Sequence, residues 1–244
     1  MRKISAFFLL LIGLTISCSF DREERSGLLW KIISKEGEVG YIFGTIHLYP
    51  KDRLKISEEV FSKLKQCKTL ALERNIKDST DQKLFAESPN GAQKLLRTYQ
   101  VVSEQFGADL KSMEVELITF ADSYDIKLTG LETSTELLSL MYKAPNIAKD
   151  ETDEYILERY EKSINLYKDG RIDHFANAIL NKELGLETRK LLVDQRNLNW
   201  IDNIESLINQ DNVFIAVGMG HLGGENGLLN LLAKKGYQLE KVKI

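Results

Sequence analysis

The sequence predicts a single α/β domain, built on a mixed β-sheet with a large helical insertion. Short apolar runs typical of strands are scattered from residue 28 to residue 242, rather than gathered in one region. Between residues 79 and 210 the apolar residues recur mostly with a helical period, interrupted once near residue 130. The length of 244 residues accommodates one large domain, and no repeat of solenoid period is present.

Composition places the chain among ordinary globular proteins. Hydrophobic residues make up 43% and charged residues 28%, which is typical of a chain with a packed core. The formal net charge is -3, so there is no basic surplus to suggest a nucleic-acid partner. Only three prolines occur and no stretch is low in complexity, so we expect no long disordered linker.

The first residues are predicted to be a targeting segment rather than part of the fold. Arg2 and Lys3 precede an apolar run over 6–16, which has the length of a signal-peptide core and is too short to span a bilayer comfortably. We therefore expect residues 1–17 to be a lipoprotein-type signal peptide and the protein to be exported. An ordinary secretory peptide and an uncleaved anchor are the alternatives.

Cys18 is the expected lipidation site, through which the protein would be anchored to a membrane on the periplasmic or cell-surface side. It follows the apolar run with the small residue Ser17 before it, which resembles a lipobox, although Thr15 stands where an apolar residue is usual. The polar stretch 18–27 is predicted to be a tether. The other cysteine, Cys67, is expected to be a small buried hydrophobe rather than a nucleophile.

The fold is predicted to open with a β-hairpin followed by a helix. Apolar runs at 28–33 and 39–46 flank a polar stretch that contains Gly37, which is typical of two antiparallel strands joined by a short turn. Residues 54–66 carry apolar side chains at helical spacing, and Ser57 is a suitable N-cap for that helix.

The middle of the chain is predicted to contain two short strands and long helical stretches. The strands lie at 69–72 and 127–131. Residues 79–125 are predicted to be mostly helical, and the clearest 3.6-residue period is that of Leu110, Met113, Leu117, Phe120 and Ala121. Thr133 and Glu136 match a capping box, so another helix is expected to begin there.

The last part of the chain is predicted to return to the sheet. Residues 150–209 have helical patterns, and 213–217 form a fully apolar strand. A short helix over 228–235 is expected to end at Gly236, and a final strand over 237–242 follows.

Two of the three histidines occur in matching contexts. Each follows a predicted strand, in the pattern Gly-x-x-His-Leu, as Gly44 to His47 and as Gly218 to His221. In α/β sheets, sites form just beyond the carboxyl ends of strands, so the two imidazoles are expected to converge. Gly44, Gly218 and Gly220 are expected to let a substrate approach the backbone.

Two carboxylates occupy equivalent places, because Glu73 and Glu132 each end a predicted strand. Imidazole and carboxylate together are ligands for zinc, manganese, iron or cobalt. The alternative role for one carboxylate is that of a general base. Strand-end polar residues are also found as structural hydrogen-bonding groups.

The helix around residue 195 carries polar residues near its apolar face. That face is predicted to consist of Leu191, Leu198, Ile201, Ile204 and Ile208. Asp194 and Asn197 interrupt or border it, and Arg196 is offset from it. In one interpretation these side chains point into the site, where Arg196 binds a carboxylate or an oxyanion and Asn197 contacts substrate. In the other, Asp194 and Arg196 are solvated and Asn197 caps a neighbouring loop. His174 is expected to be structural.

Together these motifs resemble the TraB/GumN (TIKI-like) family. The resemblance covers residues 28–244, which we take as one TraB/GumN domain. The matching segments, in the family's order, are 29–32, 41–47, 72–73, 130–133, 196–197, 216–222, 224–229 and 236–237.

The resemblance implies a fold and a site. Animal TIKI proteins in this family are described as metal-dependent proteases, bacterial members are linked to control of peptide pheromones, and the fold is similar to that of erythromycin esterase and the haem-associated ChaN proteins. It implies an erythromycin esterase/ChaN-like α/β core in which His47, Glu73 and His221 hold a divalent manganese, cobalt or zinc ion. Glu132 and Arg196 are implied as neighbours.

The first hypothesis is therefore a metal-dependent hydrolase, a peptidase of the TIKI/TraB type, acting on a peptide or a small ester. Glu132 would be a further ligand or the base, and Arg196 would hold a substrate carboxylate or the transition-state oxygen. The alternatives are a protein that binds a peptide without cleaving it and a metal-free esterase-like hydrolase with histidine as base.

Overall fold

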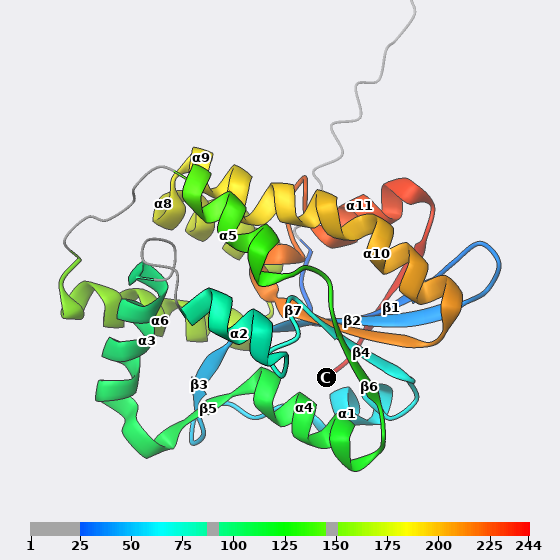
Figure 1. The fold of residues 1–244 in the computed structure, drawn as a ribbon, viewed down its shortest axis with the longest axis horizontal. Helices are drawn as coiled ribbons and strands as arrows, with labels where there is room; N and C mark the ends of the chain where they lie inside the picture. The colour runs from blue at the N-terminus through cyan, green and yellow to red at the C-terminus, as the bar shows by residue number, and fades with distance from the viewer. Residues whose placement is uncertain (1–24, 87–92, 145–150) are drawn as a thin grey trace, which may run out of the picture.

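A six-stranded mixed β-sheet lies at the centre of the computed structural model, which describes residues 25–86, 93–144 and 151–244 (Figure 1). The strand order is β6-β4-β7-β2-β1-β8. In that order the strands are Lys127–Gly130, Thr69–Leu72, Val213–Gly218, Val39–Thr45, Leu29–Ile33 and Gln238–Val242. The first four are parallel to one another, and β1 pairs antiparallel with both β2 and β8. The predicted mixed sheet is confirmed.

The predicted hairpin forms the β1–β2 pair. Leu29 lies opposite Phe43 and Ile33 opposite Val39. Gly37 in the connection has φ +94°, a left-handed conformation that favours glycine. The strand pairing and its turn therefore follow from the local sequence.

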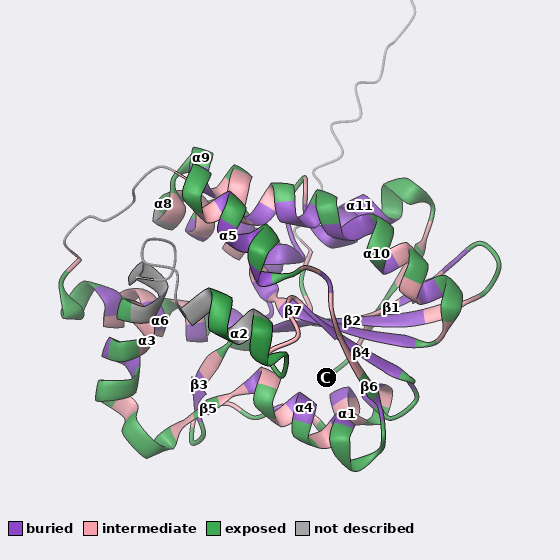
Figure 2. Ribbon diagram, viewed as in Figure 1, coloured by how far each residue is buried: buried purple, intermediate pink, exposed green. Residues whose placement is uncertain are grey.

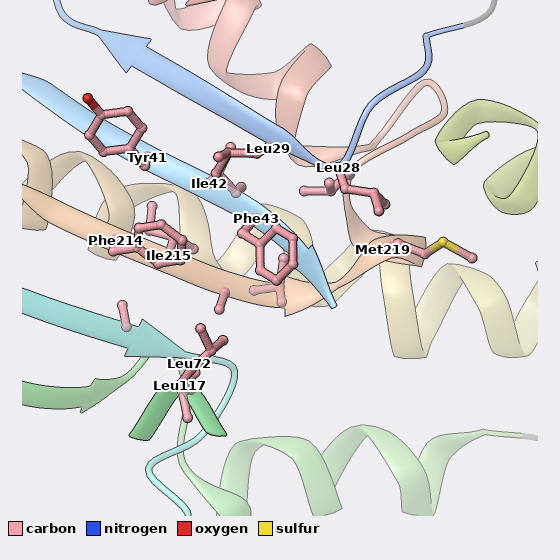
Figure 3. Packing of buried hydrophobic residues seen from close by; sticks show 14 of the residues in the cluster. Leu28, Leu29, Tyr41, Ile42, Phe43, Leu72, Leu117, Phe214, Ile215 and Met219 are labelled. Carbon is pink, nitrogen blue, oxygen red and sulfur yellow. The ribbon is translucent and has the colours of Figure 1, made fainter. Parts of the chain in front are cut away.

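Helices cover both faces of the sheet. α10 (Arg196–Gln210) and α11 (Leu228–Lys235) lie over one face, while α1 (Glu58–Leu64) and α4 (Met113–Ser123) lie under the other (Figure 1). The central strands β2, β4 and β7 are buried along most of their length, whereas the edge strands β6 and β8 are not (Figure 2). Side chains from several strands pack together in the core (Figure 3), among them Leu29, Ile42, Phe43, Leu72, Phe214 and Ile215.

The predicted helical region, apart from α4 and α10 on the faces of the sheet, gathers at the end of the sheet where the parallel strands finish (Figure 1). Its α-helices are α2 (Ser79–Ala86), α3 (Gln93–Phe106), α5 (Ser134–Lys143), α6 (Asp153–Lys168), α7 (Ile172–His174), α8 (Leu180–Leu184) and α9 (Leu186–Arg189). Two stretches, Phe175–Ile179 and Lys190–Gln195, have π-helical hydrogen bonding.

One part of the helix prediction is wrong. Residues 110–112 were expected to be helical but form the strand β5 (Leu110–Ser112), which pairs antiparallel with β3 (Leu48–Pro50). The helix begins only at Met113, because the Ser112 side chain accepts a hydrogen bond from the Val115 amide and so caps its first turn. Leu110 therefore belongs to a strand, although its spacing fits the helix.

The predicted helix caps are confirmed. Ser57 caps α1, so this helix begins at Glu58 rather than at residue 54. Thr133 and Glu136 form the reciprocal capping box of α5. Gly236, at φ +97°, ends α11.

Hydrogen bonds hold the first described residues, Arg25 and Gly27, against the rest of the fold. Within the predicted tether, the Arg25 amide donates to Asp173 and the Gly27 amide donates to the Gly170 carbonyl. Cys18 and the predicted signal peptide lie outside the described residues. In the part of the chain that the structure describes, none of the helices has the length and apolar character needed to cross a membrane.

Candidate functional site

The predicted strand-end residues meet at one edge of the sheet. β6, β4, β7 and β2 are adjacent and parallel, so their carboxyl ends lie side by side. Glu73 directly follows β4, and its Oε1 accepts a hydrogen bond of 2.8 Å from the Gly218 amide at the end of β7. The same oxygen lies 3.7 Å from His221 Nε2. The topology thus brings together groups that are far apart in the sequence.

Arg196, in the first turn of α10, joins the two carboxylates. Its Nη2 lies 2.6 Å from Glu73 Oε2, and its Nε lies 2.9 Å from Glu132 Oε1. The other oxygen of Glu132 accepts from the Trp200 indole N–H at 3.2 Å. Arg196 is only 7% exposed. Both oxygens of Glu132 are therefore engaged, and the guanidinium is buried between acidic partners.

His221 is held from behind by Asn197. The Asn197 amide nitrogen donates to the carbonyls of His221 and Asn226, which fixes the amide oxygen as the acceptor facing the ring. His221 Nδ1 lies 2.6 Å from that oxygen, so Nδ1 carries the hydrogen. On the other side of the ring, Arg196 Nη1 donates to Nε2 over 3.3 Å. Nε2 therefore holds the lone pair and faces Glu73.

His47 is held by a residue that the sequence did not suggest. Its Nδ1 lies 2.9 Å from Oε1 of Glu114, near the start of α4. A carboxylate only accepts hydrogen bonds, so Nδ1 is the donor. The His47 side chain is 46% exposed, whereas that of His221 is 8% exposed. One imidazole is thus open to a ligand and the other is buried.

Burial and neighbouring charges shift the titration of the two histidines in opposite directions. Burial is the main cause that lowers the pKa of His221 to about 3, and the charge of Arg196 adds to this effect. Burial also opposes charge on His47, but the ionisable groups of Tyr99, Glu114 and Glu73 outweigh it and raise the pKa of His47 well above its ordinary value. His221 is therefore neutral near pH 7.

Two carboxylates of the site, Glu73 and Glu114, are held in the charged form, whereas burial raises the pKa of Glu132. Burial opposes ionisation of Glu73, but the adjacent Arg196 guanidinium and the Gly218 amide hold the pKa of Glu73 well below its usual range. In the same way, His47 outweighs the burial of Glu114 and lowers the pKa of that carboxyl. The site therefore contains fixed negative charge beside both rings.

Comparison with protein families identifies the family of this chain. The model of the TraB/PrgY/gumN family matches residues 28–95 and 86–241. The chain belongs to the TraB/PrgY/gumN family. Comparison with curated proteins gives no match. The family resemblance read from the motifs is confirmed, and the finer likeness to the erythromycin esterase and ChaN folds stays a prediction.

The three glycines of the family's Gly-x-x-His segments have different surroundings. A side chain at Gly44 would clash with Leu222, and one at Gly220 would clash with Leu180. Glycine at these two positions therefore allows the neighbouring leucine side chains to pack closely. At Gly218 a Cβ atom would instead lie 3.3 Å from Glu73 Oε1 and 3.5 Å from His47 Nε2. Of the three, only Gly218 lies against polar groups of the site rather than against apolar side chains.

Among residues 25–86, 93–144 and 151–244, no group of three or more histidine, cysteine, aspartate or glutamate side chains is arranged to hold a metal ion. Arg196 hydrogen-bonds both Glu73 and His221, where a cation would otherwise be coordinated. The donor types nevertheless suit a divalent ion, since two imidazoles and a carboxylate are its usual ligands. Holding Nδ1 of each ring, as Glu114 and Asn197 do, is also the usual arrangement behind metal-bound histidines.

The predicted apolar face of the helix around residue 195 needs a correction. Leu198 is 50% exposed, whereas Arg196 and Asn197 are buried. Within α10 the buried residues Asn197, Ile201, Ile204 and Ile208 recur at the ordinary α-helical period, and Leu198 lies off that stripe. Asn197 then caps the neighbouring loop and holds His221, and Asp194 pairs with Arg189 at 3.3 Å.

Two site residues, Glu114 and Trp200, were missed by sequence reasoning. Glu114 lies among the acidic residues of a helix first turn, where a carboxylate is common without any functional reason. Trp200 lies one turn after Arg196, and that spacing was the available signal, because residues four apart share a helix face. His174 lies in α7 rather than at a strand end, in agreement with a structural role.

Proposed function

We propose that this protein is a metal-dependent hydrolase of the cell envelope that cleaves a peptide or a small ester. One observation carries the proposal: Nδ1 of His47 and of His221 is held by a protein acceptor, and Nε2 of each ring lies on the side of Glu73 and Gly218. Nε2 would be the ligating atom of each ring, with the ion replacing the hydrogen bond that Arg196 donates to His221 Nε2. Paired imidazoles with a carboxylate at a sheet edge are suited to hydrolysis rather than to structural support.

His47, His221 and Glu73 are the residues that would hold a manganese, cobalt or zinc ion. Such an ion lowers the pKa of a bound water and polarises the carbonyl under attack. Glu73 Oε1 and His47 Nε2 both lie within 3.5 Å of where a Gly218 Cβ would be, and this closeness supports a ligand shared by the two groups. The open side of His47 gives that ligand access from solvent.

Arg196 and Glu132 act on the other groups of the site. The contacts of Arg196 with both carboxylates favour a role in keeping Glu73 ionised and oriented. Both oxygens of Glu132 are used by Arg196 and Trp200, which favours a positioning role over that of base or ligand. Asn197, which is fully buried, orients His221 rather than touching substrate.

A second candidate, a metal-free hydrolase with a histidine base, has one observation in its favour. Arg196 Nη1 already donates to His221 Nε2, so the lone pair of that ring is satisfied without an ion. In this alternative the neutral imidazole of His221 stays next to the guanidinium. His47, which is the more exposed ring, is then the group that exchanges a proton with water or substrate.

The experiment that tests the proposal is elemental analysis of the protein, followed by a peptide-library screen with and without chelator. The His47→Ala/His221→Ala variant is compared with His174→Ala, which removes the third histidine outside the site. Metal in the wild type and in His174→Ala, but not in the double variant, supports the proposal. Hydrolysis that resists chelation supports the metal-free candidate, and a peptide recovered intact from a 1:1 complex points to binding without cleavage.

The envelope location is proposed from the sequence. We infer that lipid on Cys18 anchors the exported protein to a membrane, because this cysteine follows a signal-like apolar run. Cell fractionation of the wild type and of Cys18→Ser tests this inference. The variant is expected to leave the membrane fraction, and an unchanged distribution contradicts lipid anchoring.

A further inference from the structure

Glu114 is fixed in place more firmly than an ordinary first-turn carboxylate. Its Oε1, which contacts His47, also accepts a hydrogen bond of 2.7 Å from the Thr45 hydroxyl at the end of β2. The Ser112 hydroxyl lies 3.2 Å from Oε2. The side chain is 14% exposed. Glu114 is therefore held by the strand that leads to His47 and by the cap of its own helix.

His47 needs such a partner more than His221 does. The centroid of the buried His221 ring lies 4.6 Å from that of the Trp200 ring, and both ring nitrogens of His221 make hydrogen bonds. His47 is nearly half exposed, and the interaction with Glu114 is the contact that fixes which face of its ring turns to the site. The hydrogen bond made by one ring nitrogen sets which nitrogen carries the proton.

We propose that Glu114 is the positioning residue for His47, holding a proton on Nδ1 so that in the neutral ring the lone pair belongs to Nε2 and is directed to the site beside Gly218 and Glu73. In this role Glu114 matches Asn197, which does the same for His221 from the opposite side. The charged acceptor, Glu114, therefore holds the exposed ring of His47, and the neutral acceptor, Asn197, holds the buried ring of His221. The ligating function of Nε2 rests on the hydrolase proposed above, but the orientation of His47 by Glu114 does not.

The first test reads the tautomer directly. The protein has three histidines, so long-range ¹H–¹⁵N spectra of the full-length protein can assign His47 by comparison with His47→Gln. They are recorded without metal, at a pH where the His47 ring is neutral. The wild type is expected to show His47 protonated on Nδ1. In Glu114→Ala and Glu114→Met the proton is expected to redistribute toward Nε2, and either variant suffices if the other does not fold.

Glu116→Gln is the matched control. It makes a comparable change two residues along the same helix, where the carboxylate accepts from the Tyr49 hydroxyl rather than from a histidine. This variant is expected to leave His47 protonated on Nδ1. The proposal is overturned if the Glu114 variants keep the wild-type tautomer, or if Glu116→Gln changes it as much as they do.

The second test uses Zn²⁺ alone, titrated into the same full-length proteins by calorimetry. Loss of the residue that orients a metal-bound histidine is expected to weaken binding about 10- to 100-fold in the Glu114 variants, with no change in Glu116→Gln. Equal affinity in wild type and Glu114 variants contradicts the positioning role. If the wild type binds no Zn²⁺, the metal-dependent hydrolase fails, while the tautomer spectra still decide the role of Glu114.

Discussion

Arg196 Nη2 lies 2.6 Å from Glu73 Oε2, and this contact keeps a charged carboxylate at the centre of the site. The same guanidinium reaches Glu132, so one buried cation stands between two buried anions. Separating such partners is costly, because a charge left alone in the interior loses its hydration without compensation. The network thus contributes to stability and, in our proposal, to the chemistry of the same side chains.

Replacing Arg196 with methionine is expected to destabilise the protein by about 3–5 kcal/mol, since Glu73 and Glu132 then lose their shared partner. Urea unfolding measures this loss. Arg97→Met is the control, because the Arg97–Asp153 ion pair is exposed on both sides and its removal is expected to cost at most about 1 kcal/mol. A similar loss of unfolding free energy in the two variants would show that the buried ion pairs of Arg196 stabilise the protein no more than an exposed ion pair does.

The neutral state of His221 predicts a pH dependence of stability. Its pKa is about 3 in the folded protein and 6.5 ordinarily, so between these values the unfolded chain binds a proton that the folded chain does not. Stability from this group is therefore present above pH 6.5 and is lost as the pH falls toward 3, by up to about 1.4 kcal/mol per pH unit.

The difference between wild type and His221→Gln isolates this effect, with chelator present to exclude metal. Their unfolding free energies are expected to differ by a constant amount above pH 7. Below pH 6.5 the wild type is expected to lose stability relative to the variant. A difference that stays constant down to pH 4 would mean that the pKa of His221 is the same in the folded and unfolded protein.

Gly218→Ala is expected to block the site while preserving the fold. The added methyl would lie 3.3 Å from Glu73 Oε1 and 3.5 Å from His47 Nε2, in the space proposed for the ligand. Gly40→Ala is the matched control, because its Cβ would be 3.3 Å from Ile208 and Val213, away from the strand ends that form the site. Both changes are expected to cost about 1–3 kcal/mol by overpacking.

Metal content and hydrolysis then separate the two glycine variants. Only Gly218→Ala is expected to lose metal and activity. If it retains both at wild-type levels, the ligand does not occupy the space beside Gly218.

Cys67 is expected to be unreactive in the folded protein. Burial raises the pKa of its thiol to about 12, and the sulfur donates to the Lys63 carbonyl. In a Cys18→Ser background, which leaves Cys67 as the single cysteine, a thiol reagent at pH 8 is expected to label it only after denaturant is added. Rapid labelling without denaturant would contradict a structural role for this cysteine.

The sequence predicted the residues whose neighbours in the chain determine their position. His47 and His221 follow apolar strands after a glycine, and Glu73 ends another strand, so the sheet topology alone brings them together. Local capping at Ser57 and Thr133 was equally readable, because a cap depends on residues within one helical turn.

Residues whose role depends on irregular or distant structure were not predictable in the same way. The burial of Arg196 depends on Glu73 and Glu132, which lie 123 and 64 residues away in the sequence. Glu114 lies 67 residues from the histidine that it holds. Leu110 fits a helical period but pairs in β5 with Pro50, a contact that only the tertiary fold provides.

The position of β7 has a consequence for how the molecule is made. β7 lies between β2 and β4 in the sheet, but it is synthesised after both of them and after β6. At a translation rate of roughly 5–20 residues per second, the nascent chain carries β2 and β4 for on the order of ten seconds before β7 leaves the ribosome. During that interval neither strand has its central neighbour. When β7 pairs with β2 and β4, it completes the centre of the sheet and brings His221 to the site. A chain truncated before Val213 therefore lacks both the central strand and this histidine.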